Sequence, residues 1–248
     1  MVYGFIICAG RQSRFKSETP KALVNVNGKT LLQINNEALS AYCDKVYVVC
    51  SVENQSYFNC KNKIVIKSGK GSGDAVWQAL ETLNIQPKDS GFIMWGDSLQ
   101  SASIFSYLKE NYKGQAMIPC VYEENPYVQI KKKDNNSVLV KFSKFGEPIT
   151  AGFHDLSVFY CELHQLITKL REFSNKIKNA KGNYIHKHGN EMEFLDVFNE
   201  TDIKAEIFEL KHYQDFSFNT IEQLDKLLEK WLPLNKNNFF MTNLSLKL

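Results

Sequence analysis

The chain has 248 residues, 44% of them hydrophobic and 23% charged, with a formal net charge of +3. This length and composition fit a globular protein with a sizeable core, and the small charge argues against nucleic acid as the main partner. No apolar run approaches the roughly 20 residues that a membrane-spanning helix needs. The six cysteines are scattered without a C-x-x-C pair, and no basic segment precedes the first apolar run, so we expect a cytoplasmic protein without a signal peptide.

The first half of the chain predicts strands and helices in alternation. Apolar runs predict strands at residues 2–9, 45–51, 62–66, 92–95 and 116–120. Apolar residues at helical spacing predict helices at 30–42, after the glycine-rich stretch 69–73, and at 103–111. Because short strand–helix units build parallel sheets, we expect an α/β protein with a Rossmann-like, mostly parallel sheet and helices on both faces.

The second half departs from this alternation. Residues 128–131 and 137–142 predict a small inserted β-hairpin, and 151–160 a strand that returns to the sheet. Helices are expected at 162–173, 190–199 and 219–232, a strand at 205–210, and a polar loop at 174–189. We expect one domain over residues 1–233. For the tail, 234–248, the sequence leaves open whether it is docked or disordered.

The most informative stretch follows the first predicted strand. Gly10, Arg11 and Arg14 lie in the loop after it, and Lys21 follows Pro20 shortly afterwards. Glycine lets the backbone approach a ligand closely, while backbone N–H groups and cationic side chains hold phosphate oxygens, so the loop suits a polyphosphate. Neither a P-loop nor a dinucleotide-binding glycine pattern is present. A glycine after a first strand is common, but Gly10, Arg14 and Pro20-Lys21 together at this spacing are far more specific.

This stretch resembles the signature of the sugar-phosphate nucleotidyltransferase family. The matching residues are Cys8-Ala9-Gly10-Arg11-Gln12-Ser13-Arg14-Phe15 and Pro20-Lys21-Ala22-Leu23, and Gln12 departs from the family, which has a second glycine there. The resemblance implies that Ala9, Gly10 and Arg11 bind the nucleotide. It further implies that Arg14 and Lys21 are catalytic.

Two further motifs strengthen the resemblance. Gly71-Ser72-Gly73 is similar to the family's second glycine motif, which holds the nucleobase through its backbone; the alternative is an ordinary strand-to-helix turn with Ser72 as N-cap. Trp95-Gly96-Asp97 resembles the aromatic-Gly-Asp motif whose aspartate binds Mg²⁺. The pattern around Asn219 matches the second metal ligand, with Asp215 as the other candidate. A hard cation with carboxylate and phosphate oxygens relieves the repulsion between two reacting phosphates.

The acceptor side of the site carries a weaker signal. Residues 190–196 resemble the region that binds the acceptor in the family; Glu191 and Asp196 match best, and Glu193 is a rival. Gly152, before the predicted returning strand, is a further candidate for approach to the acceptor or ribose. We expect the inserted hairpin to form part of an acceptor lid.

The resemblance implies an Mg²⁺-dependent nucleotidyltransferase. The short chain lacks the hexapeptide repeats of bifunctional uridylyltransferases. It is more similar to enzymes that transfer CMP from CTP to phosphocholine or phosphoglutamine, for capsule or other cell-surface decoration. The alternatives are a uridylyl- or thymidylyltransferase acting on a sugar 1-phosphate, and a non-catalytic nucleotide sensor. The oligomeric state stays open.

Overall fold

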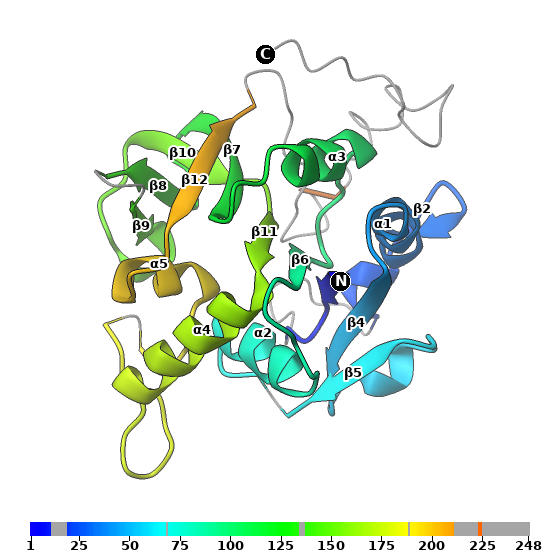
Figure 1. The fold of residues 1–248 in the computed structure, drawn as a ribbon, viewed down its shortest axis with the longest axis horizontal. Coiled ribbons are helices and arrows are strands. Elements are labelled where there is room, and N and C mark those ends of the chain that lie inside the picture. The colour runs from blue at the N-terminus through cyan, green and yellow to red at the C-terminus, as the bar shows by residue number, and fades with distance from the viewer. Residues whose placement is uncertain (11–18, 68, 134–136, 188, 211–222, 225–248) are drawn as a thin grey trace.

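The computed structural model describes residues 1–10, 19–67, 69–133, 137–187, 189–210 and 223–224. A ten-stranded sheet runs through these residues in the order β5-β4-β1-β6-β11-β7-β10-β8-β9, with β12 paired to β7 (Figure 1). In its first half β1 (Val2–Ile7) pairs in parallel with β4 (Lys45–Ser51) and β6 (Ser90–Trp95), and β4 with β5 (Lys63–Ile66). The predicted α/β architecture is confirmed.

The second half of the sheet is mostly antiparallel. It contains β7 (Ala116–Glu124), β8 (Val128–Lys132), β9 (Val138–Phe142), β10 (Ala151–Asp155) and β11 (Val158–Glu162). The strand β11 pairs antiparallel with both β6 and β7, whereas β12 (Ala205–Glu209) runs parallel to β7. The sheet is therefore parallel where the first half of the chain builds it and mixed beyond β11.

Helices cover both faces of the sheet. They are α1 (Leu31–Ser40), α2 (Ser72–Glu81), α3 (Ala102–Glu110), α4 (Leu163–Ile177) and the short α5 (Val197–Glu200). Figure 1 shows α2 and α4 together on one side and α1 and α3 on the other. The buried residues form two large clusters, one under each helix pair, because successive side chains of each strand point to opposite faces.

Several short elements connect the longer strands and helices. They are the 3₁₀ turns Lys21–Leu23, Gln55–Tyr57, Ser143–Phe145 and Phe194–Asp196, and the strand pair β2 (Asn25–Val26) and β3 (Lys29–Thr30). Thr30 caps α1 as predicted, because its hydroxyl accepts from Gln33 N and the Gln33 side chain accepts from Thr30 N. The predicted helix over 190–199 is shorter, beginning as a 3₁₀ turn at Phe194 and continuing into α5.

One prediction for the middle of the chain was wrong in detail. The strand expected over 151–160 is two strands, β10 and β11, because Ser157 adopts a φ of 61° and its N–H bonds to Asp155 Oδ1 at 2.9 Å. The predicted inserted hairpin is confirmed as β8 and β9, and it extends the main sheet, because Phe153 of β10 pairs with Ile130 of β8. Of the predicted helix 219–232, only residues 223–224 are described, and the tail 234–248 lies outside the described residues.

No helix in the described ranges is long and apolar enough to cross a bilayer. The six cysteines are unpaired, and Cys8 and Cys50 are buried, as expected of small core residues. Burial, followed by the charge of Asp97, raises the pKa of the Cys8 thiol. Cys8 is therefore a core residue that packs at the end of β1, and its thiol is not reactive.

The aromatic packing on β6 gives a test of the fold. Phe92 has no exposed surface, and its ring lies 5.3 Å from that of Phe105 and 4.4 Å from that of Tyr160. We expect Phe92→Ala to lower the free energy of unfolding by about 3–5 kcal/mol, measured by urea denaturation, because it leaves a cavity between the sheet and α3. The matched control, Val65→Ala on the exposed side of β5, should cost less than about 1 kcal/mol. Equal losses would contradict this packing.

Candidate active site

The carboxyl ends of β1 and β6 lie side by side. Ile7 at the end of β1 pairs with Trp95 at the end of β6, and Gly96 N donates to the carbonyl of Ile7 at 3.0 Å. Ala9, which is buried, and Gly10, which is exposed, therefore emerge beside Asp97. Ligands collect at such ends in open α/β sheets. The first and third sequence motifs thus meet at one edge of the sheet.

Lys21 and Asp97 form an ion pair at this edge. Lys21 Nζ lies 3.0 Å from Asp97 Oδ2; the lysine side chain is 6% exposed and the aspartate side chain 36%. Lys21 belongs to the 3₁₀ turn that begins after Pro20, and Asp97 to the turn after β6. Because the lysine is buried and the aspartate is partly exposed, solvent reaches the ion pair on the side of the Asp97 carboxylate. Two motif residues 76 positions apart therefore contact each other.

The Asp97 carboxylate suits a hard divalent cation, because such ions prefer oxygen ligands, and Mg²⁺ is often held by one or two carboxylates together with substrate phosphates. No cluster of three or more metal-ligating side chains is found within the described residues. Leu224 lies in one small core cluster with Leu99, which brings residues 223–224 close to the segment after β6 that carries Asp97. Arg11, Arg14, Asn219 and the alternative Asp215 lie outside the described residues.

The glycine-rich loop before α2 packs against the chain around Met192. Gly71 has a φ of +103°, and a Cβ there would lie 2.5 Å from the carbonyl oxygen of Met192; a Cβ on Gly73 would lie 2.9 Å from the same atom. Gly73 N donates to Met192 O at 2.8 Å, and Met192 N donates to Lys70 O at 2.7 Å. The sequence suggested that the two glycines let a nucleobase approach the backbone closely. In the structure, the Met192 backbone makes such a close approach on one side of the loop.

The N-terminus of α2 is unsuited to a phosphate. Its N–H groups at Gly73 and Asp74 both point at Met192 O. The buried Asp74 carboxylate accepts from Tyr184 Oη at 2.6 Å, Lys70 N at 2.9 Å and Gln78 Nε2 at 2.8 Å. Burial, and then the hydrogen bond to Asp74, raise the pKa of Tyr184. A buried carboxylate repels a second anion, so a ligand at this loop should be neutral there, as a nucleobase is.

Ser72 belongs to a network that links three segments. It is the first residue of α2, and Gly71, not Ser72, is the N-cap, so the simple capping alternative is wrong. Its hydroxyl donates to Glu193 Oε2 at 2.9 Å and accepts from Phe194 N at 2.9 Å. The other oxygen of Glu193 pairs with Lys144 Nζ. Glu193, the rival acceptor residue, is thus tied to the glycine-rich loop.

Aromatic contacts connect this network to the edge that carries Asp97. The ring of Trp95, two residues before Asp97, lies 5.6 Å from that of Phe194, and both contact Phe159. Phe194 follows Glu193 directly and has no exposed surface. A rigid aromatic cluster therefore joins the Gly71–Gly73 loop to the end of β6.

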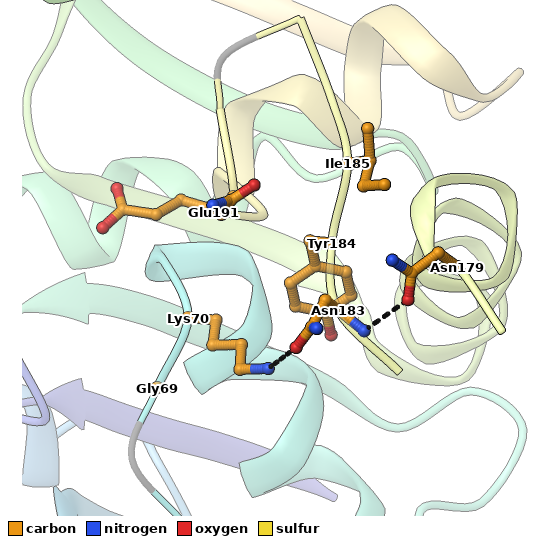
Figure 2. A pocket seen from close by; sticks show the side chains of 8 residues that line it. Gly69, Lys70, Asn179, Asn183, Tyr184, Ile185 and Glu191 are labelled. Atoms are coloured by element: carbon orange, nitrogen blue, oxygen red, sulfur yellow. Dashed lines mark hydrogen bonds between the residues drawn. The ribbon is translucent and has the colours of Figure 1, made fainter. Parts of the chain in front are cut away.

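Glu191 lines a cavity of about 450 Å³ outside this network. The cavity is also lined by Gly69, Lys70, Asn179, Asn183, Tyr184, Ile185 and Asn190. Figure 2 shows Lys70 reaching Asn183, whose Oδ1 it meets at 3.1 Å, while the Glu191 carboxylate points away from them. Glu191 is exposed, so its carboxylate is open to a ligand.

The structure places the other two acceptor candidates in the interior. Asp196 has no exposed surface; its carboxylate accepts from Asn199 Nδ2 at 3.1 Å and lies 3.6 Å from His186 Nδ1. Gly152 is buried in β10, and a Cβ there would lie 2.7 Å from Gln129 Cγ. Packing within the protein therefore accounts for both residues, and neither presents itself to an acceptor in this conformation.

Sequence reasoning missed Lys144 and the pairing of Tyr184 with Asp74. Lys144 lies in a 3₁₀ turn after β9, with its ammonium 4.7 Å from the Phe145 ring centroid, and it belongs to no motif. Tyr184 is 1% exposed although its neighbours in the chain are polar. A large aromatic residue inside a lysine- and asparagine-rich stretch is the one signal that points to a buried anchor there.

Comparisons with known proteins agree with this geometry. Residues 4–176 match the model of the MobA-like NTP transferase domain. The chain belongs to this family. The resemblance of the sequence to nucleotidyltransferases is thereby confirmed.

Curated proteins and solved structures resemble this chain. The chain is 24% identical over 262 residues to the bifunctional protein GlmU of Ruthia magnifica subsp. Calyptogena magnifica, with 99% of this chain and 55% of the relative covered. It spans about half the length of the curated relatives it matches. A Bacillus anthracis protein assigned as a glucose-1-phosphate thymidylyltransferase has a TM-score of 0.69 at 13% identity, covering 93% of this chain and 95% of that one.

A second solved structure has the same fold. The CTP:phosphocholine cytidylyltransferase of Streptococcus pneumoniae (LicC) has a TM-score of 0.61 at 14% identity, covering 93% of this chain and 99% of that one. At such identities the likeness shows the fold alone.

The contact between Gly71 and Met192 gives a stability prediction. We expect Gly71→Ala to lower the free energy of unfolding by about 2 kcal/mol or more, because alanine meets both an unfavourable positive φ and the Met192 backbone. The matched control is Gly114→Ala: Gly114 has a φ of +86°, but no described atom lies within 4 Å of its Cβ position. It should cost about 1 kcal/mol, the strain alone. Equal losses in urea denaturation would contradict the close approach.

Proposed function

We propose that this nucleotidyltransferase transfers CMP from CTP to the phosphate of a small molecule of the phosphoglutamine or phosphocholine type and releases pyrophosphate. The product would serve cell-surface polysaccharide or lipid decoration. The observation that carries the proposal is the contact of Lys21 Nζ with Asp97 Oδ2 at 3.0 Å, at the carboxyl ends of β1 and β6. It unites a cation for phosphate oxygens with a carboxylate for a metal ion at one edge of the sheet.

The reaction needs no catalytic base. A phosphate monoester has a second pKa of about 6, so the acceptor phosphate is largely a dianion at neutral pH. One of its oxygens attacks the α-phosphorus of CTP; a new P–O bond forms, the bond between the α-phosphorus and the bridging oxygen breaks, and pyrophosphate leaves with that electron pair. Catalysis then consists of positioning and charge neutralisation.

The chain's cationic residues supply that neutralisation. We assign Gly10 and Arg11 to the triphosphate, Arg14 to the charge that develops on pyrophosphate, and Lys21 to a bridge between the α-phosphate and the acceptor phosphate. The Lys21 ammonium has three donors, and Asp97 engages one of them. Lys21 is therefore held in place by Asp97 before any phosphate binds.

Asp97, with Asn219 as the second ligand, would hold Mg²⁺. Bound there, the ion would shield the negative charge of the α-phosphate during attack. The Asp97 side chain is 36% exposed, which supports access for a cation and its phosphate ligands. The carboxylate of Asp97 would then contact both the ion and the Lys21 ammonium, which share it.

The base and the acceptor would be bound by neighbouring segments of the chain, because Met192, which follows Glu191, packs against the glycine-rich loop. We assign the base to the Gly71–Gly73 loop, where the buried Asp74 disfavours phosphate. For the acceptor we assign Glu191, which is exposed at the neighbouring cavity. Asp196 and Gly152 would act only by holding the surrounding chain, since both are buried.

A sugar 1-phosphate acceptor with UTP or dTTP is the second candidate. The B. anthracis protein of the same fold, assigned as a glucose-1-phosphate thymidylyltransferase, favours it. Pyrophosphate release with Mg²⁺ separates the candidates when CTP, UTP, dTTP, ATP and GTP are each tested against phosphocholine, phosphoglutamine and sugar 1-phosphates. Release with CTP and a non-sugar acceptor supports the proposal. Binding of a triphosphate without release in any pairing would favour the nucleotide sensor instead.

Asp97 provides the test of the metal assignment. We expect Asp97→Asn to slow pyrophosphate release by about 100-fold or more, because the carboxylate charge that holds the ion is lost. The fold should persist, since the amide keeps the size of the side chain. Asp202→Asn, which removes a carboxylate whose side chain is 79% exposed, is the control and should leave release unchanged. An Asp97→Asn enzyme with full Mg²⁺-dependent activity would contradict the assignment.

Gly10 separates ligand contact from folding. No described atom lies within 4 Å of a Cβ built on Gly10, and its φ is not in the left-handed range. We expect Gly10→Ala to change the free energy of unfolding by less than about 1 kcal/mol, yet to weaken triphosphate binding by about tenfold or more, because the methyl group enters the space assigned to phosphate. Calorimetric titration measures the affinity. Unchanged affinity would remove Gly10 from the site.

A further inference from the structure

The hydroxyl of Ser72 is oriented by its protein neighbours. Ser72 Oγ donates its proton to Glu193 Oε2 at 2.9 Å and accepts the N–H of Phe194 at 2.9 Å. A serine hydroxyl has one hydrogen to donate and two lone pairs to accept with. The hydrogen and one lone pair are therefore engaged, which leaves one lone pair for a ligand.

Glu193 keeps the Ser72 proton in this orientation. Its side chain is only 9% exposed, and its other carboxylate oxygen pairs with the Lys144 ammonium. If the Ser72 proton turned toward a ligand, Glu193 Oε2 would lose that donor in a buried position, which is costly for a carboxylate. Ser72 therefore offers a ligand an acceptor and withholds its donor.

We propose that Ser72 selects a nucleobase whose exocyclic group is an amine. This inference rests on the proposed function, which assigns the base to the Gly71–Gly73 loop. The 4-amino group of cytosine would donate to the remaining lone pair of Ser72 Oγ. The 4-oxo group of uracil or thymine would instead bring its own lone pairs against it. Buried polar groups that match one substrate and oppose another are an effective source of discrimination.

The Lys144–Glu193 pair makes the selection reversible by one substitution. In Glu193→Gln, the amide oxygen should take the position beside the Lys144 ammonium, because an ammonium group only donates. The amide nitrogen then faces Ser72 Oγ and donates to it. The Ser72 proton, displaced from that side, turns outward and becomes a donor for a carbonyl oxygen.

The experiment measures dissociation constants for CTP and UTP by calorimetry, with Mg²⁺ and without an acceptor. We expect the unsubstituted protein to bind CTP about tenfold more tightly or better, the effect of one matched hydrogen bond. Glu193→Gln should lower the ratio of UTP to CTP dissociation constants by about tenfold or more, with tighter UTP binding. Ser72→Ala should bring the ratio toward one, because it removes both the hydrogen bond to the amine of CTP and the repulsion of the oxo group of UTP. ATP and ITP, which differ by an amine and a carbonyl, extend the comparison to purines.

The control is Glu110→Gln on α3, which removes the same charge from an exposed residue and should leave the ratio unchanged. Thermal unfolding verifies that each variant folds, and Ser72→Ala tests the inference even where Glu193→Gln is unstable. A ratio that is the same in Ser72→Ala as in the unsubstituted protein overturns the inference; if that protein still releases pyrophosphate, the proposed function stands. Failure to bind any of these triphosphates overturns the proposed function itself.

Discussion

The parallel pairing of β1 with β4 and β6 is the constraint on which the site depends. Because β1 lies between the other two strands, its carboxyl end is fixed on both sides: Ile7 pairs with Val49 and with Trp95. The chain that leaves β1 at Gly10 and the chain that leaves β6 at Asp97 therefore begin from a common rigid edge. Helices packed on both faces prevent this edge from shifting, since a slip of one residue would expose an entire buried face.

That constraint explains why much of the fold could be predicted from sequence. The apolar run that becomes β1 and the valine-rich run that becomes β4 carry a period and composition that few other structures satisfy. Thr30 marks the start of α1, because its capping box with Gln33 is a local hydrogen-bond pattern that involves no distant residue. Such features are local, so a sequence displays them. The edge location of Asp97 followed from the same logic, because strand ends in parallel sheets converge.

What could not be predicted depends on contacts between distant segments. The break between β10 and β11 arises at Ser157, whose positive φ has no strong local signature. The burial of Asp196 depends on Asn199 and His186 closing over it, although an aspartate near a helix start usually faces solvent. The partnership of Ser72 with Glu193 joins residues 121 positions apart. A sequence pattern does not show a contact between such distant residues. The glycine-rich loop could therefore be recognised from the sequence, whereas the residues that pack around it could not.

The glycine-rich loop shows how one motif can satisfy packing and recognition together. Gly71 and Gly73 allow Met192 to lie flush against the start of α2, and the Met192 carbonyl then takes up the helix N–H groups that would otherwise attract a phosphate. With those two donors engaged and the buried Asp74 beside them, this part of the loop disfavours anions, and the Ser72 hydroxyl is one polar group that it offers to a ligand. The same packing that makes the glycines structurally necessary therefore also defines the hydrogen-bonding character of the surface they present. A nucleotide bound with its phosphates near Lys21 and Asp97 would meet a loop suited to its base alone, and the aromatic contact between Trp95 and Phe194 holds the two regions at a fixed spacing.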